Sequence, residues 1–474
     1  MREVTRRLRI GRMVRHGVSR RSFRVALRRA GPRRLRPIRS ALVVIWGLAG
    51  LIAIGTAALL LPFATRDGAE TSFLTAFFTA ASAACTTGLV VVDTADHWTL
   101  FGQVVILILF QIGGLGFLTS STLILLLLRQ RLDLRDRLLL QGALGEGALG
   151  GVVALIRRIV IFALVVEAAG AVLLTATFWR GRDPATALWF GVFHSVSAFT
   201  NASFDLMGGF SGFSGQQSDA FLLLVLAALI ITGGISFAVV ADLRRVRGFG
   251  RLTLDSKLVL VTTGLLLVAG TAGFFALERR DAGTLGPLPL PDALLQSFFY
   301  SVNSRSSGFQ TLNAADFGSA TLLLLAALMF VGGAAGSTAG GVKVNSVAVL
   351  AATVLSAVKG RPHVVVFWRT IPMRTVMRAL TVAVLASLFV FAAAFTLTAT
   401  ESITFLPLLF EATSAFGTVG FSTGITHELD VLSRLVLILA MFVGRLGPLT
   451  LAVALAGPDD EARVRYPDAD VRIG

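Results

Sequence analysis

Eight long apolar segments, separated by short charged stretches, constrain this chain more than any other feature. They lie near residues 41–62, 100–128, 157–179, 218–240, 257–277, 318–350, 375–399 and 432–456. Each has roughly the 20 residues that an α-helix needs to cross a bilayer. Hydrophobic residues make up 55% of the chain and charged residues only 15%, which exceeds the apolar content of a water-soluble fold. The sequence therefore predicts an all-α membrane protein with eight transmembrane helices.

Four shorter segments rich in small residues lie between the members of successive pairs of spans. They fall near 71–84, 186–199, 291–304 and 403–416 and are too short to cross, so we expect re-entrant half-helices. Their ends align without gaps: Phe78–Gly88 reads FTAASAACTTG, Phe193–Ser203 reads FHSVSAFTNAS, Phe298–Gly308 reads FFYSVNSRSSG and Phe410–Gly420 reads FEATSAFGTVG. Similarity of this kind within one chain predicts four equivalent units around a common axis.

These patterns divide the chain into four repeats and two tails. The expected boundaries are an N-terminal tail at 1–40, repeat 1 at 41–128, repeat 2 at 157–240, repeat 3 at 257–350, repeat 4 at 372–456 and a C-terminal tail at 457–474. Residues 1–39 carry fifteen arginines against the single acid Glu3. Because this tail lacks interleaved aromatic residues, we expect it to lie near anionic lipid headgroups and not to bind nucleic acid. A nucleic-acid contact, or a true start at Met13, are the alternatives.

Basic residues also follow the second, fourth and sixth spans. They are Arg129, Arg131, Arg135, Arg137, Arg157 and Arg158; Arg244, Arg245, Arg247, Arg251 and Lys257; and Lys359, Arg361, Arg369, Arg374 and Arg378. Positive loops favour the cytoplasmic side, so these loops and both tails are expected in the cytoplasm of a multi-pass plasma-membrane protein. The half-helices then enter from the extracellular side. The loops on that side carry the acids Asp93, Asp96, Asp205, Asp316 and Glu428.

Neither an enzyme nor a metal centre of the usual kind is indicated. Cys85 is the single cysteine, which excludes an internal disulfide and a cysteine metal site. Glu167 and Glu411 are isolated acids within the apolar segments, and the five histidines are scattered along the chain, so no catalytic cluster is expected. The first apolar stretch, from about Ala41, is long enough to span the membrane and is not expected to be a cleaved signal peptide.

Each half-helix is followed by a short polar stretch of small residues. The four stretches are Cys85-Thr86-Thr87-Gly88, Thr200-Asn201-Ala202-Ser203, Arg305-Ser306-Ser307-Gly308 and Gly417-Thr418-Val419-Gly420. Irregular backbone at membrane depth is tolerated where it is buried in protein or lines an aqueous path. Four such loops on one axis can point carbonyl oxygens inward and replace the hydration shell of a monovalent cation. The half-helices add the partial negative charge of their C-terminal ends, which favours cations.

These polar stretches resemble the filter sequences of the Trk/Ktr/HKT superfamily of potassium transporters. The resemblance is carried by Thr86–Thr94, Asn201–Asp205, Arg305–Phe309 and Thr418–Ser422, and it covers about residues 41–456. It implies four M1-P-M2 units around a pseudo-four-fold pore, with eight transmembrane helices and four pore half-helices. It also implies potassium uptake, a homodimer, and a cytosolic nucleotide-binding ring of the RCK type that regulates the pore. The chain length looks closer to the Ktr type than to the longer Trk type.

The resemblance assigns the selectivity filter residue by residue. It comprises Thr86, Thr87, Gly88, Asn201, Ala202, Ser203, Ser306, Ser307, Gly308, Thr418, Val419 and Gly420. Within this set, potassium is expected at Thr87, Gly88, Ala202, Ser203, Ser307, Gly308, Val419 and Gly420. No organic cofactor is expected in this chain.

Ser203 departs from the family, in which glycine is usual at this position. It adds a β-carbon and a hydroxyl beside the ion path, and in plant members a filter serine goes with sodium permeation. A sodium-permeable or sodium-coupled transporter is therefore an alternative, and Ser203→Gly is expected to raise the potassium-to-sodium permeability ratio. The other interpretation is that Ser203 accommodates the same backbone as glycine.

The run Gly332–Gly341 is too rich in glycine to remain helical, so the sixth span should break. It resembles the family's intramembrane gating loop. The resemblance assigns the gate to Gly336, Ser337, Thr338, Ala339 and Gly340, together with Arg445 as a positive barrier beneath the filter. We expect Arg445 near the middle of the last span, facing the protein interior. Close helix packing by the small residues and snorkelling of Arg445 are the alternatives.

Two further glycine motifs, Gln111–Gly116 and Thr232–Ser236, lie within the second spans of repeats 1 and 2. Because they do not follow a strand, they predict close packing around the pore and not dinucleotide binding. An alternating-access secondary transporter is the remaining rival function. It would be expected to have two inverted halves, whereas the four half-helices here share one direction.

Overall fold

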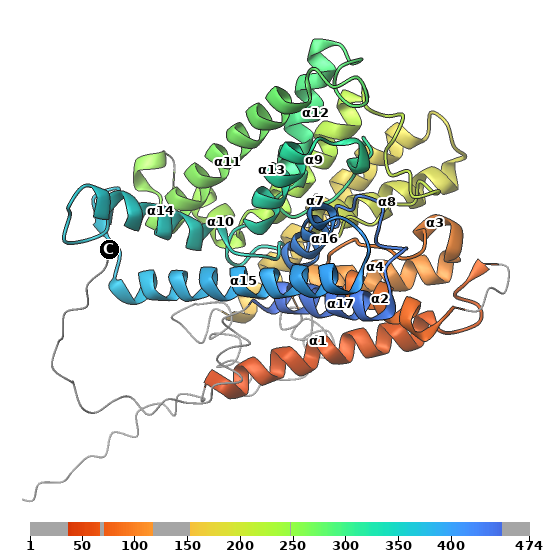
Figure 1. The fold of residues 1–474 in the computed structure, drawn as a ribbon, viewed down its shortest axis with the longest axis horizontal. Coiled ribbons are helices and arrows are strands. Elements are labelled where there is room, and N and C mark those ends of the chain that lie inside the picture. Colours follow the sequence, from red (N-terminus) through yellow and green to blue (C-terminus); the bar gives the residue numbers. More distant parts are fainter. Residues whose placement is uncertain (1–36, 67–70, 117–151, 247, 448–474) are drawn as a thin grey trace, which may run out of the picture. The chain divides into compact units, whose positions relative to one another are not determined.

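The computed structural model describes residues 37–66, 71–116, 152–246 and 248–447 (Figure 1). The chain divides into a unit of residues 1–35 and a unit of residues 36–474, and the described residues all belong to the second. The predicted C-terminal tail, most of the N-terminal tail and the basic loop from Arg129 to Arg137 lie outside the described residues.

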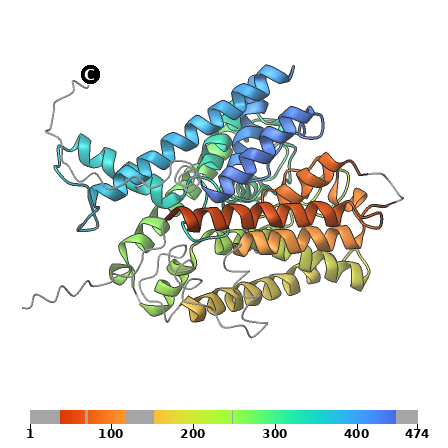
Figure 2. The same ribbon diagram turned by 90° about the horizontal axis from the view of Figure 1, so that it is seen from below.

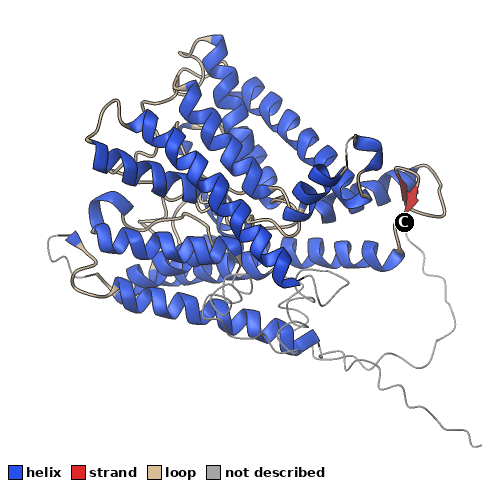
Figure 3. Ribbon diagram, turned by 180° about the vertical axis from the view of Figure 1, so that it is seen from behind, coloured by secondary structure: helices blue, strands red, loops and turns tan. Residues whose placement is uncertain are grey.

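The described part of the chain is almost entirely helical. Its α-helices are α1 (Pro37–Leu59), α2 (Phe73–Ala84), α3 (Thr94–His97), α4 (Leu100–Leu115), α7 (Val152–Phe178), α8 (Pro184–Thr200), α9 (Ala220–Gly234), α10 (Phe237–Arg245), α11 (Leu254–Glu278), α12 (Leu290–Asn303), α13 (Ser319–Phe330), α14 (Val344–Val358), α15 (Met373–Thr400), α16 (Phe405–Gly417) and α17 (Val431–Leu446). Short 3-10 turns occupy Phe249–Arg251 and Ala314–Asp316. Strands β1 (Val365–Val366) and β2 (Arg369–Thr370) form the antiparallel hairpin visible in Figure 3.

Four helices within the described ranges are long and apolar enough to cross a membrane: α1, α7, α11 and α15. The bent pair α9 and α10 adds a fifth candidate. The predicted count of eight spans is therefore not confirmed. Helices α4 and α17 end at Leu115 and Leu446, close to where description stops, and α13 ends at Phe330, where the predicted glycine-rich break begins.

The segment predicted as a span at 218–240 is not one straight helix. Helix α9 ends at Gly234, and α10 continues at an angle of 94° to it. Gly233 and Gly234 are weak helix formers, which favours an end at this point. Ser236 then begins the new helix, because its hydroxyl oxygen accepts the N–H of Ala238.

The half-helix boundaries are confirmed to within two residues by α2, α8, α12 and α16. Each half-helix packs against the long helix that precedes it, namely α1, α7, α11 and α15. In Figure 2, α1 (red) lies beside α4 (orange), and these two helices are in contact. The half-helices bury their C-terminal halves almost completely, as Phe78, Phe193, Phe299 and Phe410 illustrate. The loops that follow them are therefore held in the protein interior.

Candidate ion pathway

The four loops predicted to form the filter approach one another so closely that their backbones are in contact. A β-carbon at Gly420 would lie 2.2 Å from the carbonyl oxygen of Thr87, and one at Gly88 would lie 2.5 Å from that of Ala202. A β-carbon at Gly308 would lie 2.4 Å from the carbonyl carbon of Gly420. The structure therefore brings together the predicted ring of Gly88, Ser203, Gly308 and Gly420. No side chain fits at its three glycines.

Three of the loops share a backbone conformation that the third repeat lacks. Thr86, Asn201 and Thr418 are left-handed, with φ of 53°, 56° and 49°. Asn201 and Thr418 cap the C-terminal ends of α8 and α16, whereas Thr86 follows Cys85, the cap of α2. Two residues later φ is positive again, at 87° for Gly88, 64° for Ser203 and 96° for Gly420. At the equivalent positions of repeat 3, Ser306 and Gly308, φ is not positive. Repeat 3 thus reaches the ring by a different path.

Serine hydroxyl groups on three of the half-helices hold the backbones of the loops that follow them. The Oγ atoms of Ser82 and Ser414 accept the N–H groups of Gly88 and Gly420, each at 3.1 Å. In repeat 2 the Ser197 hydroxyl instead donates to the carbonyl of Phe204 at 2.8 Å. These contacts fix the orientation of the loop backbones.

Side chains of two half-helices also hold the segments that follow the ring. Glu411 accepts hydrogen bonds from the Ser422 and Thr426 hydroxyls and from the Thr423 N–H. Tyr300 does the same in repeat 3, where its hydroxyl oxygen accepts the N–H groups of Thr311 and Leu312. The partners of Glu411 are hydroxyl and backbone groups, so its hydrogen bonds do not contradict the prediction that it belongs to no cluster of His, Asp and Glu. Sequence alone gave no signal for this role, because the partners lie in a following loop.

Glu167 also has hydrogen-bond partners on neighbouring helices. Its carboxylate oxygens accept hydrogen bonds from the Gln111 side chain at 3.0 and 2.9 Å. Its backbone carbonyl accepts the Ser195 hydroxyl at 2.6 Å. Glu167 therefore joins α7 to α4 and to the half-helix α8.

A cavity of about 140 Å³ lies next to the ring, and all four ring residues line it. Of the predicted outer acids, Asp93 and Asp205 line this cavity as well. Asp205 lies in the loop between α8 and α9, where burial and the nearby Asp93 charge raise its pKa to about 6, although a hydrogen bond from the Met207 N–H opposes the shift. We call this cavity the vestibule. Its acids can concentrate cations at the entrance to the ring.

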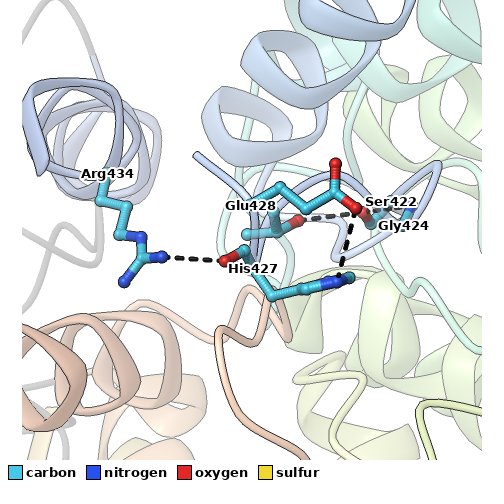
Figure 4. A network of polar contacts seen from close by, with 6 residues as sticks. Ser422, Gly424, His427, Glu428 and Arg434 are labelled. Carbon is cyan, nitrogen blue, oxygen red and sulfur yellow. Dashed lines mark hydrogen bonds and ion pairs between the residues drawn. The ribbon is translucent and has the colours of Figure 1, made fainter. Parts of the chain in front are cut away.

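The rim of the vestibule is a polar network on the loop before α17 (Figure 4). The Nε2 atom of His427 lies 3.8 Å from a carboxylate oxygen of Glu428. The backbone carbonyl of His427 accepts a hydrogen bond from the Arg434 side chain. The His427 ring stacks on Phe210, with centroids 5.3 Å apart. Phe210 comes from repeat 2, and its N–H donates to Asp93 of repeat 1 at 2.7 Å. The rim therefore joins loops from three repeats.

The predicted break in the sixth span is confirmed, and the loop between α13 and α14 lies directly against Thr418 of the predicted filter. A β-carbon at Gly340 would lie 2.1 Å from the Thr418 hydroxyl. Gly336 is exposed and Ser337 partly so, whereas Thr338, Ala339 and Gly340 are buried. The Ala339 carbonyl accepts a hydrogen bond from the Lys343 ammonium at 2.5 Å.

Every polar atom of Thr338 is bonded, and its partners come from distant parts of the chain. Its N–H donates to the Gly233 carbonyl at 3.2 Å, and its hydroxyl donates to the Phe199 carbonyl at 3.2 Å. The hydroxyl oxygen accepts the Asn201 side-chain amide at 2.6 Å. The Thr338 carbonyl accepts a hydrogen bond from Arg445. Thr338 is therefore the anchor of the loop.

Comparison with known proteins identifies the family. The chain matches the TrkH cation transport proteins over residues 42–463. It belongs to the TrkH family. The Ktr system potassium uptake protein B of Bacillus subtilis is 38% identical over 423 residues, covering 89% of this chain and 94% of that protein. The potassium/sodium uptake protein NtpJ of Enterococcus hirae is 36% identical, covering 93% of this chain and 98% of that protein.

The fold of this TrkH-family chain also matches a solved structure. The potassium transporter TrkH from Vibrio parahaemolyticus superposes with a TM-score of 0.70, over 90% of this chain and 86% of that chain. The two sequences are 21% identical, so this likeness concerns the fold alone.

The sequence of this TrkH-family chain predicted Arg445 near the middle of a helix, and the structure does not place it there. It lies in the last turn of α17, because Gly447, at a φ of 84°, ends the helix. Its guanidinium donates to the carbonyls of Thr338 and Gly113, so it bonds the predicted gating loop as well as α4.

The predicted close packing of the glycine motifs is confirmed. β-Carbons at Gly113 and Gly233 would lie 2.1 and 1.8 Å from the carbonyl oxygens of Ala84 and Phe199. Both oxygens belong to half-helix ends. Gly444 makes the same approach to Phe416 in repeat 4, at 1.8 Å, and the sequence analysis missed it. Asn201 was also missed as a partner of the loop, since nothing in its own segment points to Thr338.

Proposed function

We propose that this chain takes up potassium ions across the plasma membrane, along a path between its four filter loops. The observation that carries the proposal is the convergence of these loops, whose three ring glycines have no room for a side chain. Backbone carbonyls brought this close can replace the hydration shell of a potassium ion. The B. subtilis and E. hirae relatives are named as potassium and potassium/sodium uptake proteins, which supports the same cargo.

The proposed layout is four M1-P-M2 units about a pseudo-four-fold axis, with eight transmembrane helices and four re-entrant half-helices. The units are those expected from the sequence, with repeats at 41–128, 157–240, 257–350 and 372–456 and cytoplasmic tails at 1–40 and 457–474. Packing of each half-helix against the preceding long helix supports this layout. The same four helices then aim their negative ends at the ring.

The proposed ion ligands are the backbone carbonyls of the filter residues. They are Thr87, Gly88, Ala202, Ser203, Ser307, Gly308, Val419 and Gly420. Ser82 and Ser414 hold the backbone of the repeat 1 and repeat 4 loops through N–H groups, so the carbonyls of these two loops need not reorganise when an ion arrives. The vestibule acids Asp93 and Asp205 supply the ring with cations.

The loop at Gly336–Gly340 and Arg445 are proposed to gate this path. Gly340 lies against the repeat 4 filter, so an ion leaving the ring meets the loop. Moving the loop aside requires Thr338 to release Asn201, Phe199, Gly233 and Arg445 together. A cytosolic RCK-type nucleotide-binding ring, docked on the cytoplasmic face of a homodimer, is proposed to drive that release.

Ion flux into vesicles that contain the purified protein tests this proposal. We expect potassium to enter faster than sodium, and the flux to increase when the regulatory ring is added. Sodium is the second candidate cargo, because Ser203 replaces glycine in the ring, and equal or faster sodium flux would favour it. If the chain alone restores fully regulated growth to a strain deficient in potassium uptake, the ring is not required.

A further inference from the structure

The four repeats differ at the fifth residue of their aligned half-helix ends, which is serine in three repeats and valine in the third. These residues are Ser82, Ser197, Val302 and Ser414. In repeats 1 and 4 the serine hydroxyl accepts the N–H of the ring glycine six residues later, at 3.1 Å in both cases. Val302 has no hydroxyl. The ring glycine of repeat 3, Gly308, therefore has no such acceptor on its own half-helix.

The missing hydroxyl comes from the neighbouring repeat. Ser203 Oγ lies 2.6 Å from the nitrogen of Gly308 and accepts its N–H. The same hydroxyl donates its hydrogen to the Val419 carbonyl at 2.7 Å. Ser203 is also the one ring position that departs from glycine. Repeat 3 lacks the half-helix serine, and repeat 2 has serine in place of the ring glycine. The hydroxyl of that serine, Ser203, accepts the Gly308 N–H that the half-helix of repeat 3 leaves without an acceptor.

We propose that Ser203 and Val302 form a compensating pair, in which the Ser203 hydroxyl positions the repeat 3 filter strand and thereby sets ion selectivity. The selectivity part rests on the proposed function, and the positioning part does not. Ser203 is a positioning residue here, because it acts through the Gly308 and Val419 backbones.

Two observations support a compensating pair. Ser203 has a φ of 64°, a conformation that a β-carbon disfavours and that persists where the surroundings require it. Gly308 lies in the packed centre of the ring, where an N–H group without an acceptor is costly. Glycine at 203 would relieve the first cost but leave the Gly308 N–H unpaired.

The pair revises the expectation for Ser203→Gly. On its own, this substitution removes the hydroxyl that accepts the Gly308 N–H and holds the repeat 3 filter loop, so the potassium-to-sodium flux ratio should fall. Val302→Ser restores a hydroxyl six residues before Gly308, at the position that Ser82 and Ser414 occupy in their own repeats, and so offers the Gly308 N–H a new acceptor. The Val419 carbonyl is then also free of the Ser203 hydroxyl. The ratio in the double variant should return to the wild-type value or exceed it.

The test compares four proteins in vesicles: wild type, Ser203→Gly, Ser203→Gly with Val302→Ser, and Ser203→Gly with Val302→Ala. The alanine variant is the matched control, because it shortens Val302 without supplying a hydroxyl. Potassium and sodium fluxes and the thermal unfolding temperature are measured for each protein. We expect about a tenfold fall in the flux ratio for Ser203→Gly, equivalent to about 1.4 kcal/mol. Only Val302→Ser should rescue both the ratio and the unfolding temperature.

The proposal is overturned if Val302→Ser and Val302→Ala act alike, or if Ser203→Gly alone leaves both measurements unchanged. Should Ser203→Gly give no folded protein, Ser203→Ala replaces it, because it keeps the β-carbon and removes only the hydroxyl. If wild type carries no potassium, the proposed function fails, but the order of unfolding temperatures still tests the pair.

Discussion

The proposed filter loops of repeats 3 and 4 place Gly308 and Gly420 next to each other in the ring, but the two loops are supported in different ways. In repeat 4, Ser414 caps Gly420 and Glu411 holds the outer loop, so the half-helix supplies both supports. In repeat 3 the outer loop is held by Tyr300, but Gly308 depends on Ser203 of repeat 2. The comparison teaches that equivalent positions in a repeat can be fixed by bonds that cross repeat boundaries.

The largest expected effect tests whether both strands share one constriction. Gly420→Ala and Gly308→Ala each place a β-carbon against backbone, 2.2 Å from the Thr87 oxygen and 2.4 Å from the Gly420 carbon. Backbone cannot yield as a flexible side chain can, so we expect potassium flux in vesicles to fall by about a hundredfold or more in both variants. Gly50→Ala is the control, since nothing lies within 4 Å of its added carbon. Normal flux in Gly308→Ala would separate repeat 3 from the constriction.

The second prediction concerns the proposed gating loop, which lies between α13 and α14 but is anchored by residues of repeats 2 and 4. Thr338→Val removes the hydroxyl bonds to Asn201 and Phe199, each worth about 1 kcal/mol. Flux without a regulatory ring should therefore increase roughly tenfold to thirtyfold. Thr353→Val is the control, because the Thr353 hydroxyl bonds only within α14. Unchanged basal flux with normal unfolding would remove Thr338 from the gate.

The third prediction compares the two outer-loop supports. Tyr300→Phe leaves the N–H groups of Thr311 and Leu312 without their acceptor, and should destabilise the fold by about 2 kcal/mol. Glu411→Gln keeps one acceptor oxygen and should cost less, about 1 kcal/mol. Thermal unfolding in detergent measures both. The reverse order would mean that repeat 4 relies on its outer support more than repeat 3 does.

The smallest expected effect concerns the vestibule shared by all repeats. The pKa of Asp205 is raised to about 6, so its carboxyl is neutral well below pH 6 and charged above it. Potassium flux at low concentration should therefore fall about threefold between pH 7 and pH 5. Because the pKa is raised in the folded state, this group makes folding less favourable as the pH rises from about 4 to 6. In Asp205→Asn the potassium flux should fall less between pH 7 and pH 5 than it does in the wild-type protein.

The sequence predicted the half-helices, the four loops and the glycine-rich break, because each rests on local spacing and on glycine or serine at fixed positions. It failed where distant segments decide the outcome. Arg445 was placed mid-helix because the apolar run continues beyond it, whereas Gly447 ends α17. The roles of Glu411 and Ser203 depend on partners that only the folded chain brings near. The direction of each half-helix could be inferred, but the bonds between loops could not.

The central claim is that the four converging loops form a potassium path, and flux of potassium against sodium in vesicles tests it most directly. The wild-type protein should carry potassium at least tenfold faster than sodium, and Gly420→Ala should reduce that flux to the level of empty vesicles. The claim would be contradicted if the folded wild-type protein carried no potassium with the regulatory ring present. Potassium flux that persisted in a folded Gly420→Ala variant would contradict it equally.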